Sequence, residues 1–151
     1  MKLAEALSVR KDLKKRIQQL EQRINSNVKV QEDEEPLEDP TELMKELHSC
    51  LMQLEELIGR INLTNIKTKN AEGLSITQLI AKKDTLTMRI GILRGIYSEA
   101  TNILSRYSPT EIRQECVIDV KQLSKQIDDY SARLRKIDME IQGLNFLTEL
   151  V

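Results

Sequence analysis

The stretch Leu43–Thr64, LMKELHSCLMQLEELIGRINLT, decides the fold that this sequence predicts. Apolar or small residues recur in it at alternating steps of three and four: Leu43, Leu47, Cys50, Leu54, Leu57, Ile61 and Thr64. A mean step of 3.5 residues keeps one side of an α-helix turned toward a partner helix, which is the condition for coiled-coil packing. Such a set of residues is called a seam below. This seam predicts a long helix packed against another helix.

Three further seams follow the same spacing, so that seams cover most of the 151 residues. Their members are Leu13, Ile17, Leu20 and Ile24; Leu79, Lys83, Leu86, Ile90, Leu93, Tyr97, Ala100, Leu104 and Tyr107; and Val120, Leu123, Ile127, Tyr130, Leu134, Ile137, Ile141 and Leu144. The seams predict helices over about residues 3–26, 40–65, 75–105 and 119–143, within a single helical domain, 1–151. Short turns between long helices favour antiparallel neighbours. The predicted fold class is therefore all-α: an antiparallel up-down four-helix bundle or coiled-coil hairpins.

Capping signals mark the starts of the last three predicted helices. Asp39 stands directly before Pro40, which is the pattern of an N-cap residue followed by proline at the first helical position. Ser75 and Asp119 stand at the corresponding positions of the next two helices, each with a glutamine three residues later. These residues fix where the helices are expected to begin.

Two connections are longer than simple turns. Residues 28–39, VKVQEDEEPLED, are extended and acidic, and residues 107–118 contain a segment that suits a short strand. In an up-down order of helices both connections emerge at the same end of the bundle. We therefore expect Val28–Gln31 to pair with Ile112–Ile118 as a short β-pair over that end.

Composition and charge favour a cytoplasmic protein that binds neither nucleic acid nor a membrane. The formal net charge is −1, which gives no electrostatic reason to expect a polyanionic partner. Charged residues interrupt the beginning of the chain, so a signal peptide is not predicted. No apolar run approaches the ~20 residues that cross a bilayer. Two cysteines fit a reducing compartment, and Cys50 is interpreted as a small buried apolar residue of its seam.

The sequence carries no catalytic motif. His48 is the only histidine, and it lies one residue past a seam position, hence toward the outside of its helix. A ferritin-like metal site needs two histidines in Glu-x-x-His pairs, and this chain cannot supply them. The five glycines form no phosphate-binding pattern. We therefore predict no catalytic residue and no cofactor.

Six carboxylates are concentrated in the first long connection: Glu32, Asp33, Glu34, Glu35, Glu38 and Asp39. Hard cations bind several oxygen ligands, but this run lacks the alternating spacing and the central glycine of an EF-hand loop. We interpret it as a solvated charged loop in which some acids pair with Arg106 or Arg113. The alternative is a metal site, for which the candidates are Glu32, Asp33, Glu34 and Glu35.

The third predicted helix carries apolar residues outside its seam as well as on it. These additional residues are Met88, Ile92, Ile96 and Ile103, and they accompany two glycines four residues apart, Gly91 and Gly95. A helix that is apolar nearly all round is a buried one, and a glycine within a helix costs about 1 kcal/mol relative to alanine. We expect the face formed by Met88, Gly91, Ile92 and Gly95 to contact a helix of a second subunit in a homo-oligomer. A helix of the same chain, or glycines that are merely tolerated, are the alternatives.

Two more polar features each have a structural and a functional interpretation. Lys83, a charged residue on a seam, either extends its ammonium group into solvent or sets the register of the helices. The other predicted end of the bundle gathers the polar residues Asn62, Thr64, Asn65, Asn70, Asn145, Thr148 and Glu149. Asn and Thr at helix ends usually bind backbone groups. A small-ligand site is the alternative there.

Four motifs carry a resemblance to a known group of proteins. They are KVQEDEEPLEDP (Lys29–Pro40), RINLTN (Arg60–Asn65), RYSPTEI (Arg106–Ile112) and EIQGLNFLTEL (Glu140–Leu150). With them the whole chain resembles an uncharacterised bacterial family of small helical proteins, some of whose members carry the inherited label septicolysin. The resemblance implies an all-helical fold and a cytoplasmic bacterial origin. It implies no established activity and no catalytic residues.

The function that the sequence favours is a non-enzymatic, self-associating helical module that presents its acidic end to an unknown protein partner. The alternative is a metal-binding or small-ligand-binding protein, or an enzyme, that uses the acidic end together with Arg106. A lytic toxin comes third. The lack of an export signal and of an aromatic-rich amphipathic element speaks against it.

Overall fold

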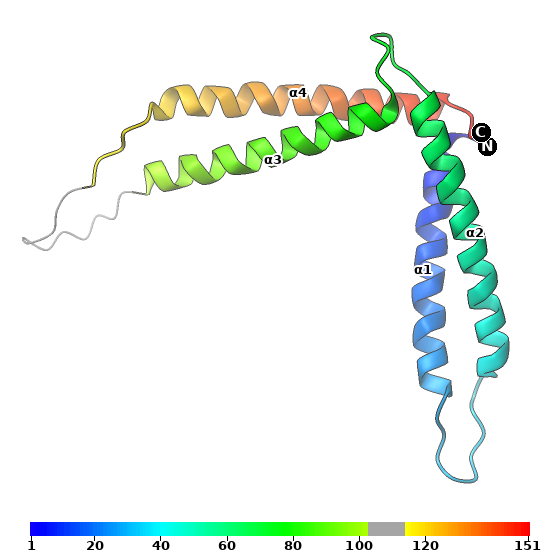
Figure 1. Cartoon of the computed structure of the whole chain (residues 1–151). Coiled ribbons are helices and arrows are strands. Elements are labelled where there is room, and N and C mark those ends of the chain that lie inside the picture. Colours follow the sequence, from blue (N-terminus) through cyan, green and yellow to red (C-terminus); the bar gives the residue numbers. More distant parts are fainter. Residues whose placement is uncertain (103–113) are drawn as a thin grey trace, which may run out of the picture. The chain divides into compact units, whose positions relative to one another are not determined.

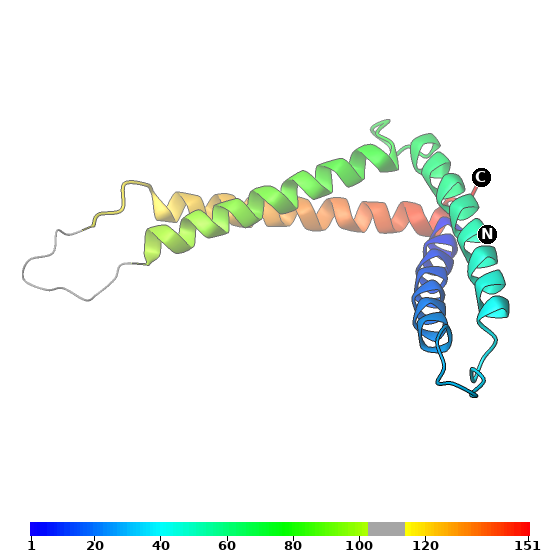
Figure 2. The same cartoon turned by 60° about the horizontal axis from the view of Figure 1, so that its bottom comes forward.

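A computed structural model of the chain, which describes residues 1–102 and 114–151, contains four long helices (Figure 1). They are α1 (Leu3–Asn27), α2 (Pro40–Lys67), α3 (Ile76–Thr101) and α4 (Val120–Leu147). Two helical hairpins result, in which α1 packs beside α2 and α3 beside α4 (Figure 2). The described residues contain no strand, so the predicted all-α fold class is confirmed.

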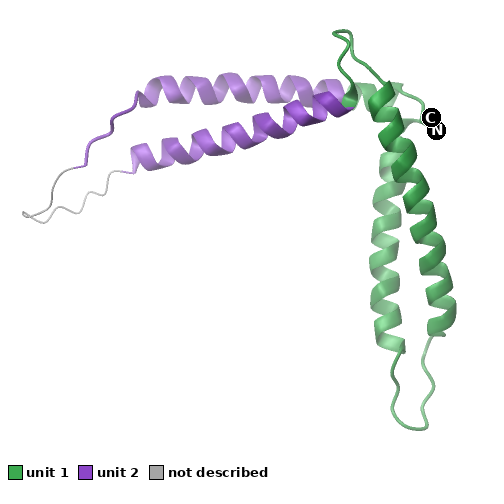
Figure 3. Cartoon of the chain, in the orientation of Figure 1, with its two compact units in different colours: residues 1–76, 142–151 green, residues 77–141 purple. Residues whose placement is uncertain are grey.

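The chain divides into two compact units (Figure 3). The first unit comprises residues 1–76 and 142–151, and it holds α1, α2 and the last turns of α4. The second unit comprises residues 77–141, and it holds nearly all of α3 with the greater part of α4.

The core of the first hairpin is built from the two predicted seams of α1 and α2. Leu20, Leu43 and Cys50 are buried at its centre. Around them pack the partly buried apolar residues Leu13, Ile17, Ile24 and Leu47. Removal of a leucine side chain from water stabilises a fold by roughly 1.5–3 kcal/mol, so a seam of this length holds two helices together.

The second unit uses its seams in the same way. Leu79 and Ile90 of α3 are buried, as are Leu123 and Ile141 of α4. The other described seam residues of these two helices are half-buried, with the exception of Tyr97, which is 37% exposed. Leu104 and Tyr107, the last two members predicted for the third seam, lie outside the described residues. The seams therefore identify the faces with which α3 and α4 meet.

Helix starts follow the predicted caps. The Asp39 carboxylate accepts a hydrogen bond from the Thr41 amide at 2.9 Å, and Pro40 is the first residue of α2. The Asp119 carboxylate accepts one from the Gln122 amide at 3.0 Å, at the start of α4. Each bond satisfies a backbone N–H group that has no partner within its own helix.

Helix α4 continues four residues beyond its predicted end near Gly143. The glycine lies inside the helix, and Leu144, the next seam residue, is half-buried. The Thr148 amide still donates to the Leu144 carbonyl at 2.9 Å. Apolar packing past the glycine thus offsets the cost of about 1 kcal/mol of a glycine within a helix.

The predicted short β-pair is wrong for Val28–Gln31, which forms no strand. This segment leads into a turn in which the Glu34 amide donates to the Gln31 carbonyl at 3.1 Å, with Asp33 at a positive φ of 67°. Ile112 and Arg113 lie outside the described residues, and residues 114–118 are irregular. The two segments also belong to different units. The carboxylates and the proline that follow Val28–Gln31 disfavour the extension of a strand, and two strands alone are marginal in water.

Candidate functional site

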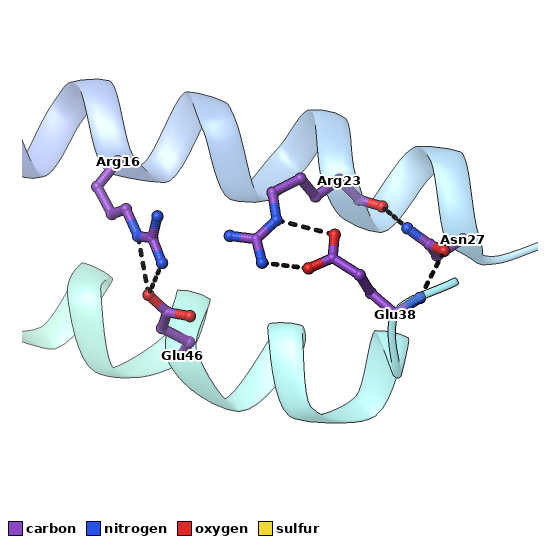
Figure 4. A network of polar contacts seen from close by, with 5 residues as sticks. All are labelled: Arg16, Arg23, Asn27, Glu38 and Glu46. Atoms are coloured by element: carbon purple, nitrogen blue, oxygen red, sulfur yellow. Dashed lines mark hydrogen bonds and ion pairs between the residues drawn. The ribbon is translucent and has the colours of Figure 1, made fainter. Parts of the chain in front are cut away.

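The tip of the first hairpin is held by three polar residues, Arg23, Asn27 and Glu38, which we name the tip clasp (Figure 4). The Arg23 guanidinium binds the Glu38 carboxylate through two nitrogens, with Nε at 2.9 Å from Oε2 and Nη2 bonded to Oε1. Asn27 is buried, and its Oδ1 accepts the Glu38 amide at 3.0 Å. Its Nδ2 donates to the Arg23 carbonyl at 2.8 Å. The clasp thus ties the end of the acidic loop to the last turns of α1.

A second ion pair continues this arrangement along the hairpin. Arg16 donates from Nε to Oε1 of Glu46 at 2.8 Å, which joins α1 to α2 (Figure 4). Arg16 and Arg23 are seven residues apart, and each directly precedes a seam residue of α1. Residues beside the seam in this way form the interhelical ion pairs of coiled coils. The two arginines therefore define the edge along which α1 and α2 meet.

The clasp changes the pKa of both of its charged groups. The hydrogen bonds from Arg23 are the largest cause that lowers the pKa of Glu38 below its usual value. The same bonds raise the pKa of Arg23. Each group is more than one third exposed, so water screens the attraction. The pair mainly fixes the geometry of the loop.

The acidic run is thereby divided between two kinds of residue. Glu38 belongs to the clasp and Asp39 caps α2, so both have structural contacts. The four metal candidates Glu32, Asp33, Glu34 and Glu35 are exposed on the loop. Within residues 1–102 and 114–151, no group of three or more His, Cys, Asp or Glu side chains is gathered so as to hold a metal ion.

The arginine that pairs with the acidic run lies on α1. The predicted partners Arg106 and Arg113 are outside the described residues. Arg23 was missed because its role depends on the register of α1 against α2. One sequence signal could have identified Arg23: it stands beside the seam, seven residues after Arg16, which stands beside the seam in the same way.

The polar residues at the other end of the first hairpin bind backbone groups, as expected. Thr64 is fully buried. Its Oγ1 donates to the Arg60 carbonyl at 2.8 Å and accepts the Val151 amide at 3.1 Å. Arg60 Nε donates to the Val151 carbonyl at 2.8 Å. The motif Arg60–Asn65 therefore holds the residues that follow α4.

The turn that follows α2 shows the same use of a polar residue. Asn70 Oδ1 accepts the amides of Glu72 at 3.1 Å and Leu74 at 2.8 Å. Gly73 adopts a positive φ of 82° within this turn. An asparagine that binds its own following backbone is a typical turn former. The prediction that Asn and Thr bind backbone groups at this end is confirmed for Asn70 and Thr64.

Residues at the start of α1 and just before it pair with the residues that follow α4. The Leu3 amide donates to the Thr148 carbonyl, and the Leu150 amide to the Met1 carbonyl, both at 2.9 Å. Glu149 forms ion pairs with Lys2 at 2.8 Å and with the Met1 ammonium group at 3.1 Å. The hydrogen bond from Lys2 is the largest cause that lowers the pKa of Glu149. This pairing is an isolated antiparallel β-bridge between Lys2 and Glu149, and it involves other segments than the two connections for which a β-pair was predicted.

Several apolar residues on one side of α3 are exposed to solvent. Met88, Ile92 and Ile96 are 68%, 58% and 43% exposed. Gly91 and Gly95 lie between them, and apart from the neighbouring turns of α3 itself no atom of the described residues comes within 4 Å of the place where a Cβ would stand at either glycine. We name these five residues the outer face of α3. By helical spacing this face lies opposite the seam residues that meet α4.

Charged and aromatic contacts join α3 to α4. Lys83 forms an ion pair with Asp138. The guanidinium groups of Arg89 and Arg133 lie over the ring of Tyr130 on α4, at 4.9 Å and 5.5 Å from its centroid. The contact of Lys83 across the hairpin favours the interpretation in which this residue sets the register. These contacts lie on the side of α3 that meets α4, so they do not cover the outer face of α3.

The remaining candidate residues lie apart from one another. His48 is exposed on α2, as its position beside the seam predicts. Cys50 is buried and Cys116 is exposed, and both are free. None of the helices in the described part of the chain is both long and apolar enough to cross a membrane.

Comparison with known proteins places the chain in a family. Residues 10–150 match the model of a family of unknown function, DUF6847, and the chain belongs to this family. A crystal structure of a functionally unknown conserved protein from Corynebacterium diphtheriae is similar to the chain over its whole length, with 32% sequence identity and a TM-score of 0.92. The match covers 100% of this chain and 99% of that one. No curated protein matches.

These findings confirm that the family is uncharacterised. Neither match carries a toxin label. Three of the four motifs that carried the resemblance contain residues with structural contacts: Glu38 in the first, Thr64 in the second and Glu149 in the last. The motifs thus coincide with the two ends of the first hairpin.

Proposed function

We propose that the protein is a non-enzymatic helical module of the cytoplasm that associates with copies of itself and presents the tip of its first hairpin to a protein partner. The observation that carries this proposal is the outer face of α3. Helix α3 has two apolar faces, of which one packs against α4 and the other is exposed in the described residues. A helix with two such faces is typical of a position between two packing partners.

The energetics of this face favour a partner over solvent. Each glycine within α3 costs about 1 kcal/mol relative to alanine. No neighbour in the described residues needs the space that Gly91 and Gly95 leave. An exposed apolar patch of this kind typically marks an interaction site. A second helix seated on the patch would use both the apolar side chains and the open glycines.

The tip of the first hairpin is the surface that we assign to the partner. The tip clasp fixes the end of the loop, and Leu37, beside the clasp, is 99% exposed. The carboxylates Glu32–Glu35 surround the turn on the same loop. A fixed loop that combines an exposed leucine with acidic groups suits a partner with a basic, partly apolar surface.

The proposal is tested by the mass of the protein in solution as a function of its concentration. We expect the wild type to exceed the monomer mass and Ile92→Glu to reduce the association, because the substitution adds a charge to the outer face of α3. Ile66→Glu on α2 is the matched control, since Ile66 is 59% exposed and Ile92 58%. A wild type that stays monomeric at every concentration would refute self-association.

A further inference from the structure

We infer that α3 pairs with α3 of a second copy in an antiparallel, two-fold contact centred between Ile92 and Gly95. This inference rests on the proposed function and specifies the contact through which two copies would associate. It concerns the outer face of α3, which is exposed in the described residues. A two-fold contact needs a surface that is complementary to itself, so that residue i of one copy meets residue j of the other and the reverse.

The order of large and small residues on α3 meets this condition. In an antiparallel pair with this centre, Ile92 of one copy lies level with Gly95 of the other. Ile96 lies level with Gly91 in the same way. Each layer formed by these four residues then combines one isoleucine with one glycine, so these layers have equal volume. The helices can approach closely because no Cβ stands at the glycines.

A parallel pair would distribute the same residues unevenly. Each isoleucine would lie level with its own copy, and so would each glycine, so wide layers would alternate with narrow ones. Close packing without voids disfavours such an arrangement. An isoleucine follows a glycine at residues 91–92 and again at 95–96. This order therefore favours the antiparallel direction.

The charge of Glu99 also favours the antiparallel direction of the pair. Glu99 follows Met88 on the same side of the helix, about three turns later, and it is exposed. In a parallel pair Glu99 would face Glu99 of the second copy, and like charges in contact are destabilising. In the antiparallel pair Glu99 of one copy lies level with Met88 of the other, so the two Glu99 carboxylates are kept apart.

The size of the face indicates a weak contact. The apolar segment runs from Met88 to Ile96, so it spans roughly 12 Å of the helix at a rise of 1.5 Å per residue. A single crossing of this length falls at the small end of known interfaces, where association is transient. We therefore expect reversible association at micromolar or higher protein concentration.

A distance measured between two copies tests the direction of the pair. We would replace Ala81 by a spin-labelled cysteine in a Cys50→Ala, Cys116→Ser background, so that each chain carries one label. Ala81 lies on the side of the outer face and is exposed. The antiparallel pair predicts about 40 Å between the labels, whereas a parallel pair predicts less than about 20 Å. Pulsed electron paramagnetic resonance resolves these values.

The outcomes separate this inference from the proposed function. A dimer mass with a distance near 40 Å supports both. A dimer mass with a short distance, or a dimer mass that Ile92→Glu leaves unchanged, overturns the antiparallel α3 contact but keeps self-association. A monomer mass at all concentrations overturns both. The labelled chain must show the same mass as the wild type, and its helix content by circular dichroism must be unchanged.

Discussion

The Glu38 carboxylate ties the acidic loop to α1 through the tip clasp, so its charge should matter for stability in a pH-dependent way. Arg23 lowers the pKa of Glu38 in the folded protein below its usual value near 4.5. The folded state therefore binds this proton less readily than the unfolded chain does. The stabilisation is fully present above about pH 4.5 and is lost as the pH falls through the lowered pKa.

Glu38→Gln should accordingly lower the temperature of thermal unfolding at pH 7. Its difference from the wild type should shrink as the pH is lowered below about 4.5. Glu35→Gln, on the exposed part of the same loop, is the control and should change little. A difference that stays constant from pH 7 to pH 3 would contradict the assigned role of the ion pair.

A second prediction at this scale concerns Gly95. Apart from the neighbouring turns of α3, a methyl group at this position meets no atom of the described residues within 4 Å. Gly95→Ala should therefore stabilise dilute, monomeric protein by about 0.5–1 kcal/mol, through helix propensity alone. Urea unfolding at low concentration measures this gain. A destabilised variant would mean that some part of the chain occupies the space beside the glycine.

Residues whose environment depends on one helix were predictable from the sequence. Cys50 is buried and His48 exposed, as their positions relative to the seam indicate. The role of Arg23 was not predictable in the same way, because it depends on which residue of another segment stands opposite. Single-helix periodicity fixes a face but gives no register between two helices.

At the scale of elements, the seams make the core of the first hairpin sensitive to truncation. Leu20 is fully buried against α2. Leu20→Ala should reduce the free energy of unfolding by about 2–5 kcal/mol, since it removes buried methyl groups and leaves a cavity. Leu51→Ala on the exposed side of α2 is the matched control and should cost much less, because Leu51 remains 46% exposed in the folded chain. Equal losses for both variants, measured by urea denaturation, would show that the seam is not the core.

Helices were predictable here and the short β-pair was not. A repeat sustained over several turns indicates one long helix, and a cap residue such as Asp39 marks where it starts. The end of α4 was misplaced because a glycine signals a stop only when apolar packing does not continue beyond it. The β-pair required two segments distant in the sequence to meet, and no local pattern specifies such a meeting.

At the scale of the whole molecule, the family and the similar crystal structure establish the fold but leave the role open. The candidate site was predictable from the sequence to the extent that it lies on one helix. The residues Met88, Gly91, Ile92 and Gly95 stand out by spacing alone, and the structure shows them exposed. What covers the face depends on another molecule, about which the sequence of one chain carries only indirect information. Self-association through this face is therefore the central claim to be tested.

Sedimentation equilibrium of the wild type and of two glycine variants tests that claim most directly. Gly95→Leu places a large side chain in the outer face of α3, whereas Gly59→Leu places the same side chain on α2, where the space is equally open. We predict a wild type that exceeds the monomer mass as concentration rises, unchanged association for Gly59→Leu and a monomer for Gly95→Leu. A Gly95→Leu variant that associates as strongly as the wild type would contradict the account.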